Sequence, residues 1–191
     1  MLVITGMGRS GTSVLSRFCY NMGYNVGGHW VNAVNAGMED PEVQKVNDRL
    51  MTGEVSERDK RFIAEFPKLV VKDPRFAYPL VMQEWASRRL DLKVLMLLRE
   101  TRHSVASRKA HPQLHPYLES VEEMNQRITD TYRTLARFRV PCRTLSFPDF
   151  LTDYDRVRGL LTKFGGLTID DERGRRSWTS LVDLNLVHHN D

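Results

Sequence analysis

A glycine-rich stretch near the start of the chain carries residue types suited to binding phosphate. It follows an apolar run and reads Gly6-Met7-Gly8-Arg9-Ser10-Gly11-Thr12-Ser13. Glycines let successive backbone N–H groups converge on one anion, and a following helix N-terminus adds its dipole and unpaired donors. Ser10, Thr12 and Ser13 add hydroxyl groups, and Arg9 adds a positive charge. The pattern therefore predicts a phosphate-binding loop that uses the residues from Gly8 to Ser13.

The same stretch matches only part of the Walker A pattern of kinases and NTPases. Gly6 and Gly11 have the Walker spacing, but Thr12 occupies the position of the Walker lysine. Ordinary γ-phosphoryl transfer needs that lysine beside the β- and γ-phosphates, together with a hydroxyl on Mg²⁺. The loop thus disfavours an ATP-dependent P-loop kinase of a nucleoside or small metabolite, which stays as the alternative function. The plain structural alternative is a glycine-rich turn between a strand and a helix.

A second cation stands at the end of another apolar run. Arg99 follows the run Val94–Leu98, and Ser107 comes eight positions later in the helix expected from about residue 102. Ligands of open α/β sheets bind at the carboxyl ends of the strands. An arginine at the strand tip and a serine on the next helix can therefore converge on a further phosphate. Taken alone, the pair is better explained by a solvated arginine and an ordinary helical serine.

The loop and the arginine–serine pair together resemble the sulfotransferase family that uses 3′-phosphoadenosine 5′-phosphosulfate (PAPS). In that family an SGT-containing loop with a lysine or arginine holds the 5′-phosphosulfate. An arginine followed eight residues later by a serine holds the 3′-phosphate. The corresponding residues of this chain are Arg9-Ser10-Gly11-Thr12 for the first motif and Arg99 with Ser107 for the second.

Further segments are similar, in the same order, to the bacterial branch of this family, which carries GYFED…LND, KDPR, YEDLL and FLGL. The corresponding stretches here are Gly37–Pro41 with Asn47–Leu50, Lys72–Arg75, Phe147–Leu151 and Phe164–Leu167. The resemblance spans most of residues 1–170. The KGxxGxW loop of the cytosolic steroid and phenol branch has no counterpart, and the basic run Arg173–Arg176 is either a substitute source of cations for the 3′-phosphate or a solvated tail.

The resemblance implies an activity and roles for particular residues. It implies in-line sulfuryl transfer, without a metal, from PAPS to a hydroxyl or amine of a small-molecule or carbohydrate acceptor. The product would be 3′-phosphoadenosine 5′-phosphate (PAP). By resemblance, Arg9 and the loop N–H groups stabilise charge on the phosphosulfate, and Lys72 stabilises the sulfonate. Glu39 stands where the bacterial branch carries an acidic residue near the reacting centre, so it is the candidate catalytic base.

These assignments have plainer alternatives. Glu39 also suits the N-terminus of the helix that follows it, where negative charge is favoured. Arg75 either contacts the donor or the acceptor, or it pairs with Asp73 in the turn forced by Pro74, and the same pairing with Asp73 is the plain alternative for Lys72. The cytosolic branch uses a histidine as base, which leaves as alternative bases His29, His103, His111 and His115.

The predicted elements place the candidate residues at one edge of a sheet. Continuous apolar runs are typical of strands covered on both faces, hence of parallel sheets. The predicted strands are Leu2–Thr5, Leu69–Lys72, Lys93–Leu98 and Arg143–Phe147. The predicted helices are Thr12–Met22, one that opens at Pro41, Phe76–Leu90, one from about Arg102, one that begins at the capping box of Ser120 and Glu123, and Tyr154–Phe164.

This alternation predicts an α/β fold in three layers, αβα, with a central, mainly parallel sheet and a P-loop-like turn for the 5′-phosphosulfate. We expect a single domain over residues 1–191, with residues 170–191 as a loop-like tail.

Composition removes several other classes of protein. The 28 Lys+Arg and 24 Asp+Glu give a net charge of +4, but the cations are scattered among the acids, which disfavours a nucleic-acid-binding module. Two cysteines without a CxxC pair form neither a disulfide framework nor a zinc site, and His188 and His189 lack a spaced third ligand. Without a leader or an apolar run that spans a bilayer, we expect a cytoplasmic protein with no membrane partner.

The acceptor is expected to be recognised by loops. These are residues 26–38, residues 111–118 and the tail, with candidate aromatic lining from His29, Trp30, Tyr117 and Trp178. A short chain has few elements with which to wall an acceptor site. The site is therefore open, or it is completed by a second copy in a homo-oligomer or by a carrier protein.

Overall fold

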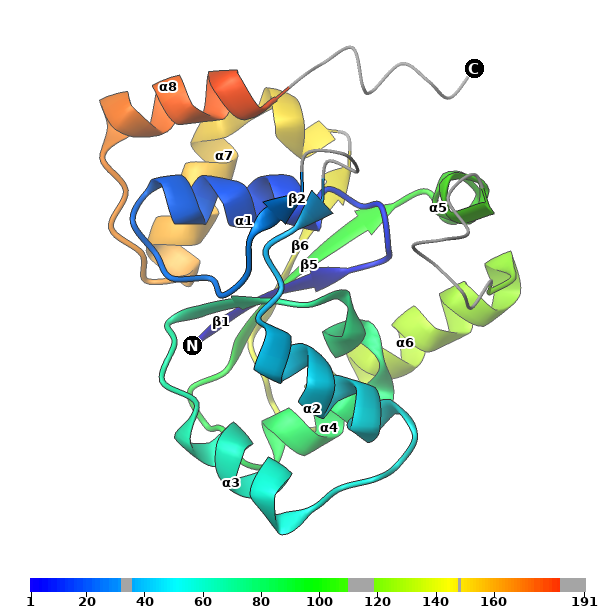
Figure 1. The fold of residues 1–191 in the computed structure, drawn as a ribbon. Coiled ribbons are helices and arrows are strands. Elements are labelled where there is room, and N and C mark those ends of the chain that lie inside the picture. The colour runs from blue at the N-terminus through cyan, green and yellow to red at the C-terminus, as the bar shows by residue number, and fades with distance from the viewer. Residues whose placement is uncertain (32–35, 110–118, 148, 183–191) are drawn as a thin grey trace.

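A four-stranded parallel sheet runs through the centre of the computed structural model, which describes residues 1–31, 36–109, 119–147 and 149–182 (Figure 1). Its order is β4-β1-β5-β6, with bounds β1 (Leu2–Gly6), β4 (Val70–Lys72), β5 (Lys93–Arg99) and β6 (Cys142–Phe147). In this register Val3 lies between Val71 and Val94. The four predicted strands are confirmed, and each end lies within one residue of the prediction.

Successive residues of the central strands supply two apolar cores, one on each face of the sheet. Val3 and Val94 face the core that is covered by α2 (Pro41–Met51), α3 (Glu57–Glu65), α4 (Pro79–Ala86) and α6 (Val121–Arg137). Ile4 and Leu95 face the core that is covered by α1 (Thr12–Asn21), α7 (Tyr154–Gly159) and α8 (Asp171–Leu181). The described residues thus form three layers, αβα, as predicted (Figure 1). None of the helices within the described ranges is long and apolar enough to cross a membrane.

Local sequence signals fix where two of these helices begin. At α6, the Ser120 side chain accepts a hydrogen bond from the Glu123 backbone at 3.1 Å, and Glu123 Oε2 accepts one from the Ser120 backbone at 2.7 Å. This is the predicted capping box. At α2, the Asp40 side chain accepts hydrogen bonds from the first-turn N–H groups of Glu42 and Val43, at 2.9 and 3.2 Å. Pro41 occupies the first helical position, where its missing N–H costs nothing.

Prolines break the helix that was predicted over Phe76–Leu90. Residues 74–77 form a short 3₁₀ helix, η2 (Pro74–Ala77), which includes the first two residues of the predicted helix. Helix α4 begins only at Pro79. The residue before a proline is driven out of the helical region, and Tyr78 is accordingly extended, with φ −102° and ψ 131°. The predicted helix Tyr154–Phe164 is also divided, into α7 and a π-helical turn, η5 (Leu160–Phe164). Helix α3 and the short hairpin of β2 (Trp30–Val31) with β3 (Ala36–Gly37) were not predicted.

The tail prediction was wrong for residues 171–181, which form helix α8. Asp170 caps this helix by accepting a hydrogen bond from the Arg173 backbone at 2.8 Å. Trp178 anchors it, because its ring packs edge-on against Phe18 with centroids 5.2 Å apart and its indole N–H donates to the Leu151 carbonyl at 3.0 Å. One buried tryptophan on an otherwise polar segment gave too weak a periodicity to reveal the helix. Residues 183–191, with His188 and His189, lie outside the described residues.

Candidate active site

The glycine-rich loop links β1 to α1 and is held in a conformation that glycine favours. Gly11 has φ +82°, and a β-carbon there would lie 2.8 Å from the rings of Phe147 and Phe150. Gly11 is also the N-cap of α1 and offers no side-chain oxygen, so the first N–H groups of the helix have no side-chain cap. Ser10 is buried, and its Oγ has no hydrogen-bond partner among the described residues. Uncapped N–H groups and a buried unpaired hydroxyl are what an anion site requires.

Two arginines and a serine from three elements meet beside this loop. Arg9 Nε donates to Ser107 Oγ at 3.2 Å, and Arg99 Nη1 donates to the Arg9 carbonyl at 3.3 Å. Ser107 belongs to α5 (Thr101–Lys109), and Arg99 ends β5 with its guanidinium over the Phe147 ring at 5.1 Å. The structure therefore brings together Arg9, Arg99 and Ser107, with Ser107 in contact with Arg9.

Among the described residues, no acid balances the charge on these two arginines. Burial lowers the pKa of the Arg9 guanidinium, and burial followed by repulsion from Arg9 lowers the pKa of Arg99. Within the described ranges, neither side chain forms an ion pair with a carboxylate. Two half-buried cations that repel each other are stabilised when an anion sits between them. The cluster of Arg9, Arg99 and Ser107 is thus suited to anionic ligands.

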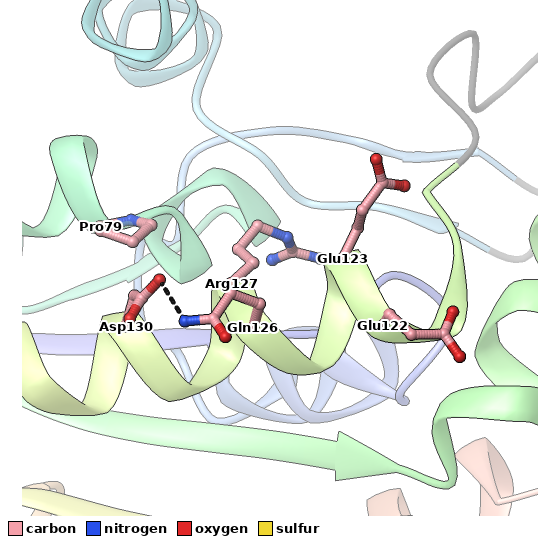
Figure 2. Close-up of a pocket in the computed structure, with 6 residues that line it drawn as sticks. All are labelled: Pro79, Glu122, Glu123, Gln126, Arg127 and Asp130. Atoms are coloured by element: carbon pink, nitrogen blue, oxygen red, sulfur yellow. Dashed lines mark hydrogen bonds between the residues drawn. The ribbon is translucent and has the colours of Figure 1, made fainter.

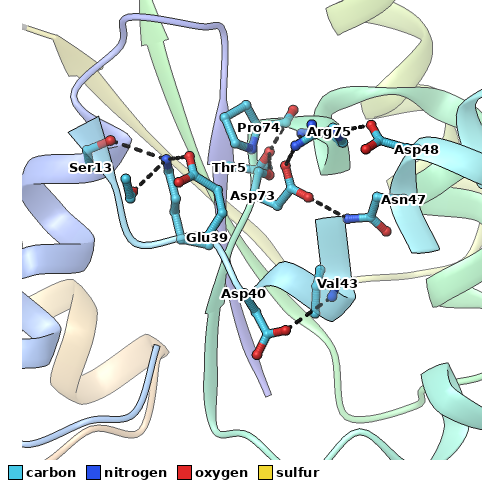
Figure 3. A network of polar contacts seen from close by, with 12 residues as sticks. Thr5, Ser13, Glu39, Asp40, Val43, Asn47, Asp48, Asp73, Pro74 and Arg75 are labelled. Atoms are coloured by element: carbon cyan, nitrogen blue, oxygen red, sulfur yellow. Dashed lines mark hydrogen bonds and ion pairs between the residues drawn. The ribbon is translucent and has the colours of Figure 1, made fainter. Parts of the chain in front are cut away.

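Lys72 and Glu39 form an ion pair near the first turn of α1, where Figure 3 labels Glu39 and Ser13. Lys72 ends β4 and is 2% exposed, and its ammonium donates to Glu39 Oε1. It also donates to the Gly37 carbonyl at 3.1 Å and to Ser13 Oγ at 3.2 Å. These three acceptors use all three N–H donors of the ammonium group. Glu39 Oε2 accepts no hydrogen bond from the described residues, so it is the free atom of the pair.

The rest of the KDPR turn is occupied by structural contacts, shown in Figure 3. The Asn47 side chain donates to Asp73 Oδ2 at 2.9 Å, and Arg75 donates to both Asp73 and Asp48. Burial raises the pKa of Asp73, and the charge of Arg75 opposes that rise. Trp85 completes the network by donating to Asn47 Oδ1 at 2.9 Å. Of the two readings of Arg75, the structure supports the pairing with Asp73 in the turn.

Several other candidates lie away from this cluster. Arg173 donates to the Asn21 carbonyl, Arg175 donates to Asp155 and Asp171, and Arg176 donates to Glu172. All three arginines are therefore engaged within the layer of α1, α7 and α8. They do not supply cations to the site. His103 faces Glu100 on the exposed side of α5, with the two side chains 3.4 Å apart. His111, His115 and Tyr117 lie outside the described residues, and Trp178 is in the core.

A shallow hollow on the α6 surface is also separate from these residues. Figure 2 shows its lining, which comes from Pro79 of α4 and from Glu122, Glu123, Gln126, Arg127 and Asp130 of α6. Gln126 donates to Asp130 there at 2.9 Å. None of the predicted site residues lines it.

Comparison with known proteins adds a fold relationship. No protein-family model and no curated protein sequence matches the chain. Solved structures do match. The sulfotransferase domain of the Synechococcus PCC 7002 olefin synthase is 12% identical with a TM-score of 0.57, over 100% of this chain and 82% of that chain. Sulfotransferase STF1 from Mycobacterium tuberculosis H37Rv is 14% identical with a TM-score of 0.51, over 96% of this chain and 72% of that chain. The chain has a sulfotransferase-like fold. The fold expected from the sequence motifs is thereby confirmed.

The sequence missed two features of this region. Phe147 lies against both Gly11 and Arg99. The sequence predicted only that Phe147 ends a strand, and it did not indicate these two contacts. Arg17 lies one helical turn beyond Ser13 on α1, over the rings of Tyr20 and Trp30. The spacing of Ser13 and Arg17 is a helical i, i+4 signal. Nothing local, however, indicates that Trp30 comes beside that helix.

Proposed function

We propose that the chain is a sulfotransferase that moves the sulfuryl group of PAPS to a hydroxyl or amine of a small-molecule or carbohydrate acceptor. The observation that carries the proposal is the meeting of Arg9, Arg99 and Ser107 at the uncapped N-terminus of α1. The Glu39–Lys72 pair joins that same helix end through Ser13. An anion site and a carboxylate thus share one edge of the sheet.

The residues at the loop fit a donor with two anionic ends. Ser10 Oγ is a buried, unpaired hydroxyl, and Arg9 and Arg99 are half-buried cations without a carboxylate partner in the described part of the chain. Arg9, Ser10 and the first N–H groups of α1 would hold the 5′-phosphosulfate. Arg99 with Ser107 would hold the 3′-phosphate. When bound, PAPS supplies the sulfuryl group, and the arginine charges offset the negative charge that grows on its bridging oxygen.

Glu39 and Lys72 supply the acceptor half of the chemistry. Glu39 Oε2 takes the proton of the acceptor hydroxyl as the new O–S bond forms and the bond from sulfur to the bridging oxygen breaks. PAP leaves with the electron pair of that broken bond. Lys72 orients Glu39 by binding Oε1, so in this arrangement its first role is to position the base.

The kinase alternative lacks a cation in the required place. Thr12 stands at the Walker lysine position, and the buried Lys72 has all its donors engaged by Ser13, Gly37 and Glu39. The glycine-rich loop therefore offers a γ-phosphate one cation, Arg9. The presence of Arg99 beside Arg9 supports a donor that carries a second anionic group, as the 3′,5′-bisphosphorylated donor does.

Ligand-induced thermal stabilisation tests the proposal. A ligand at about 100 times its Kd adds about 2.7 kcal/mol of stability. We expect a clear rise in Tm with PAP and little with AMP or Mg-ATP at the same concentration. A rise with Mg-ATP alone would favour the kinase, and no rise with PAP would contradict the proposed donor site.

A further inference from the structure

A third arginine, Arg17, lies on α1 near the Glu39–Lys72 pair. Arg17 follows Ser13 by four residues in α1, so the two side chains lie on one face of the helix, about one turn apart. Ser13 Oγ accepts the hydrogen bond from Lys72. The face of α1 that meets the Glu39–Lys72 pair therefore continues directly to Arg17.

Two aromatic rings hold the Arg17 guanidinium on that face. Its central carbon lies 5.3 Å from the centre of the Tyr20 ring and 5.9 Å from the centre of the Trp30 ring. Trp30 pairs with Gly37 across the β2–β3 hairpin, and β3 packs against α1. Because the Gly37 carbonyl also accepts from Lys72, the hairpin ties the Trp30 platform to the Glu39–Lys72 pair.

Arg17 is not needed for donor binding, because other cations are assigned to the donor. The proposed function assigns Arg9 and Arg99 to the two anionic ends of the donor, and Lys72 is paired with Glu39. In the part of the chain that the structure describes, Arg17 contacts the two rings and has no carboxylate partner. A guanidinium stacked on aromatic faces keeps its N–H edges free for an oxyanion.

We infer that Arg17, held by Tyr20 and Trp30, binds an anionic oxygen group of the acceptor, so the preferred acceptor is a hydroxylated anion. This inference rests on the proposed function, because it assigns the acceptor of the same site. The anionic group lies at a fixed distance from the hydroxyl that faces Glu39. Acceptors should therefore be selected both by charge and by the length that separates the two groups.

Matched probes test charge and length together. The probes are unbranched carboxylates that carry a terminal hydroxyl, from hydroxypropanoate to hydroxyoctanoate, each paired with its neutral amide. Binding is measured by calorimetry on the full chain, with and without saturating PAP. We expect the acid to bind about tenfold more tightly than its amide at an intermediate length, which corresponds to about 1.4 kcal/mol. Shorter and longer members should show a smaller preference.

Three variants separate the subsite from general effects. Arg17→Gln should reduce the preference for the acid to about onefold, and Arg17→Lys should leave an intermediate preference because the charge remains without the fork of donors. The matched control is Arg137→Gln, since Arg137 also stacks on a nearby ring, that of Phe138 just after α6, at 5.5 Å. This pair lies on the opposite face of the sheet from α1. This control should keep the wild-type preference.

The outcomes are distinct. Equal binding of acids and amides to the wild type, binding of neither, or an acid preference that survives Arg17→Gln would each overturn the inference. PAP is titrated separately into the wild type and Arg17→Gln. Failure of PAP to bind the wild type would overturn the proposed function, whereas the acid–amide comparison without PAP would still decide the subsite.

Discussion

Replacing Arg99 by glutamine removes one of the two half-buried cations at the loop and tests the donor site directly. The wild-type side chain donates to the Arg9 carbonyl and lies over Phe147, but burial and the charge of Arg9 both lower its pKa. A lowered pKa means that the folded protein disfavours the charged form, so the ligand-free protein gains little from this charge. We therefore expect Arg99→Gln to keep its ligand-free Tm and to lose affinity for PAP.

The size of the loss follows from the contact that would be removed. A hydrogen bond to a charged group is worth about 1.5–3 kcal/mol, which corresponds to a roughly 10- to 150-fold rise in Kd. At a PAP concentration of about 100 times the wild-type Kd, the stabilisation is about 2.7 kcal/mol. A hundredfold weaker variant would retain about 0.4 kcal/mol under the same conditions. For a chain of this length the PAP-induced rise in Tm should fall from about 5–11 °C to about 1–2 °C.

The assay is a thermal shift series with PAP and AMP on the wild type, Arg99→Gln and a control. Arg102→Gln is the matched control, because Arg102 is an exposed arginine on the adjacent helix α5. AMP lacks the 3′-phosphate, so its weak effect should be equal in all three proteins. Equal losses of PAP and AMP binding in Arg99→Gln, or an unchanged PAP shift, would refute the assignment of Arg99 to the 3′-phosphate.

Three further changes test the base, the loop and the acid stability. Glu39→Gln should lower turnover by about 10²–10⁴-fold while calorimetry gives an unchanged PAP affinity; wild-type turnover would place the base elsewhere. Gly11→Ala should lower the free energy of unfolding, measured in urea, by about 2–5 kcal/mol, because of left-handed strain and overpacking. The control Gly23→Ala should lower it by only about 1–2 kcal/mol, because φ there is +95° but the space around it is open. Arg49 and Ser56 hold the pKa of Asp59 at about 2, below its usual 3.8, so this carboxylate stabilises the fold above about pH 4 and loses that effect as the pH falls toward about 2. Asp59→Asn should therefore lower Tm at pH 7, with a difference from the wild type that shrinks below about pH 4; a constant difference would contradict the assignment.

The parts of the fold that could be predicted are those set by local rules. Continuous apolar runs gave all four strands of the main sheet, and the capping box of Ser120 and Glu123 gave the start of α6. Arg99 and Ser107 could be paired with the loop because strand ends in a parallel sheet share one edge. Their meeting beside Arg9 needed no knowledge of distant packing.

The parts that could not be predicted depend on contacts between distant segments. Helix α8 is polar up to Trp178, whose burial against Phe18 becomes visible only when the helix is docked. The two strands of the β2–β3 hairpin have two residues each, too few for a period to show. The position of Trp30 over Arg17 follows from that hairpin, so the sequence alone could name the tryptophan but not its partner.

The KDPR turn contacts the segment from Glu39 to Asp48, and these contacts explain why the roles of Glu39 and Lys72 must be considered together. Lys72 contacts Glu39, Asp73 contacts Asn47, and Arg75 contacts Asp48, so the KDPR turn is fixed in register against the start of α2. A buried ammonium has three donors, and here Ser13, Gly37 and Glu39 accept all of them. To reach a sulfonate, Lys72 would have to give up one of these bonds, and Ser13 is the uncharged side-chain acceptor among them. Under the proposed function, this geometry favours Arg9 for the charge on the sulfonate, with Lys72 holding Oε1 of Glu39 and leaving Oε2 for the acceptor proton.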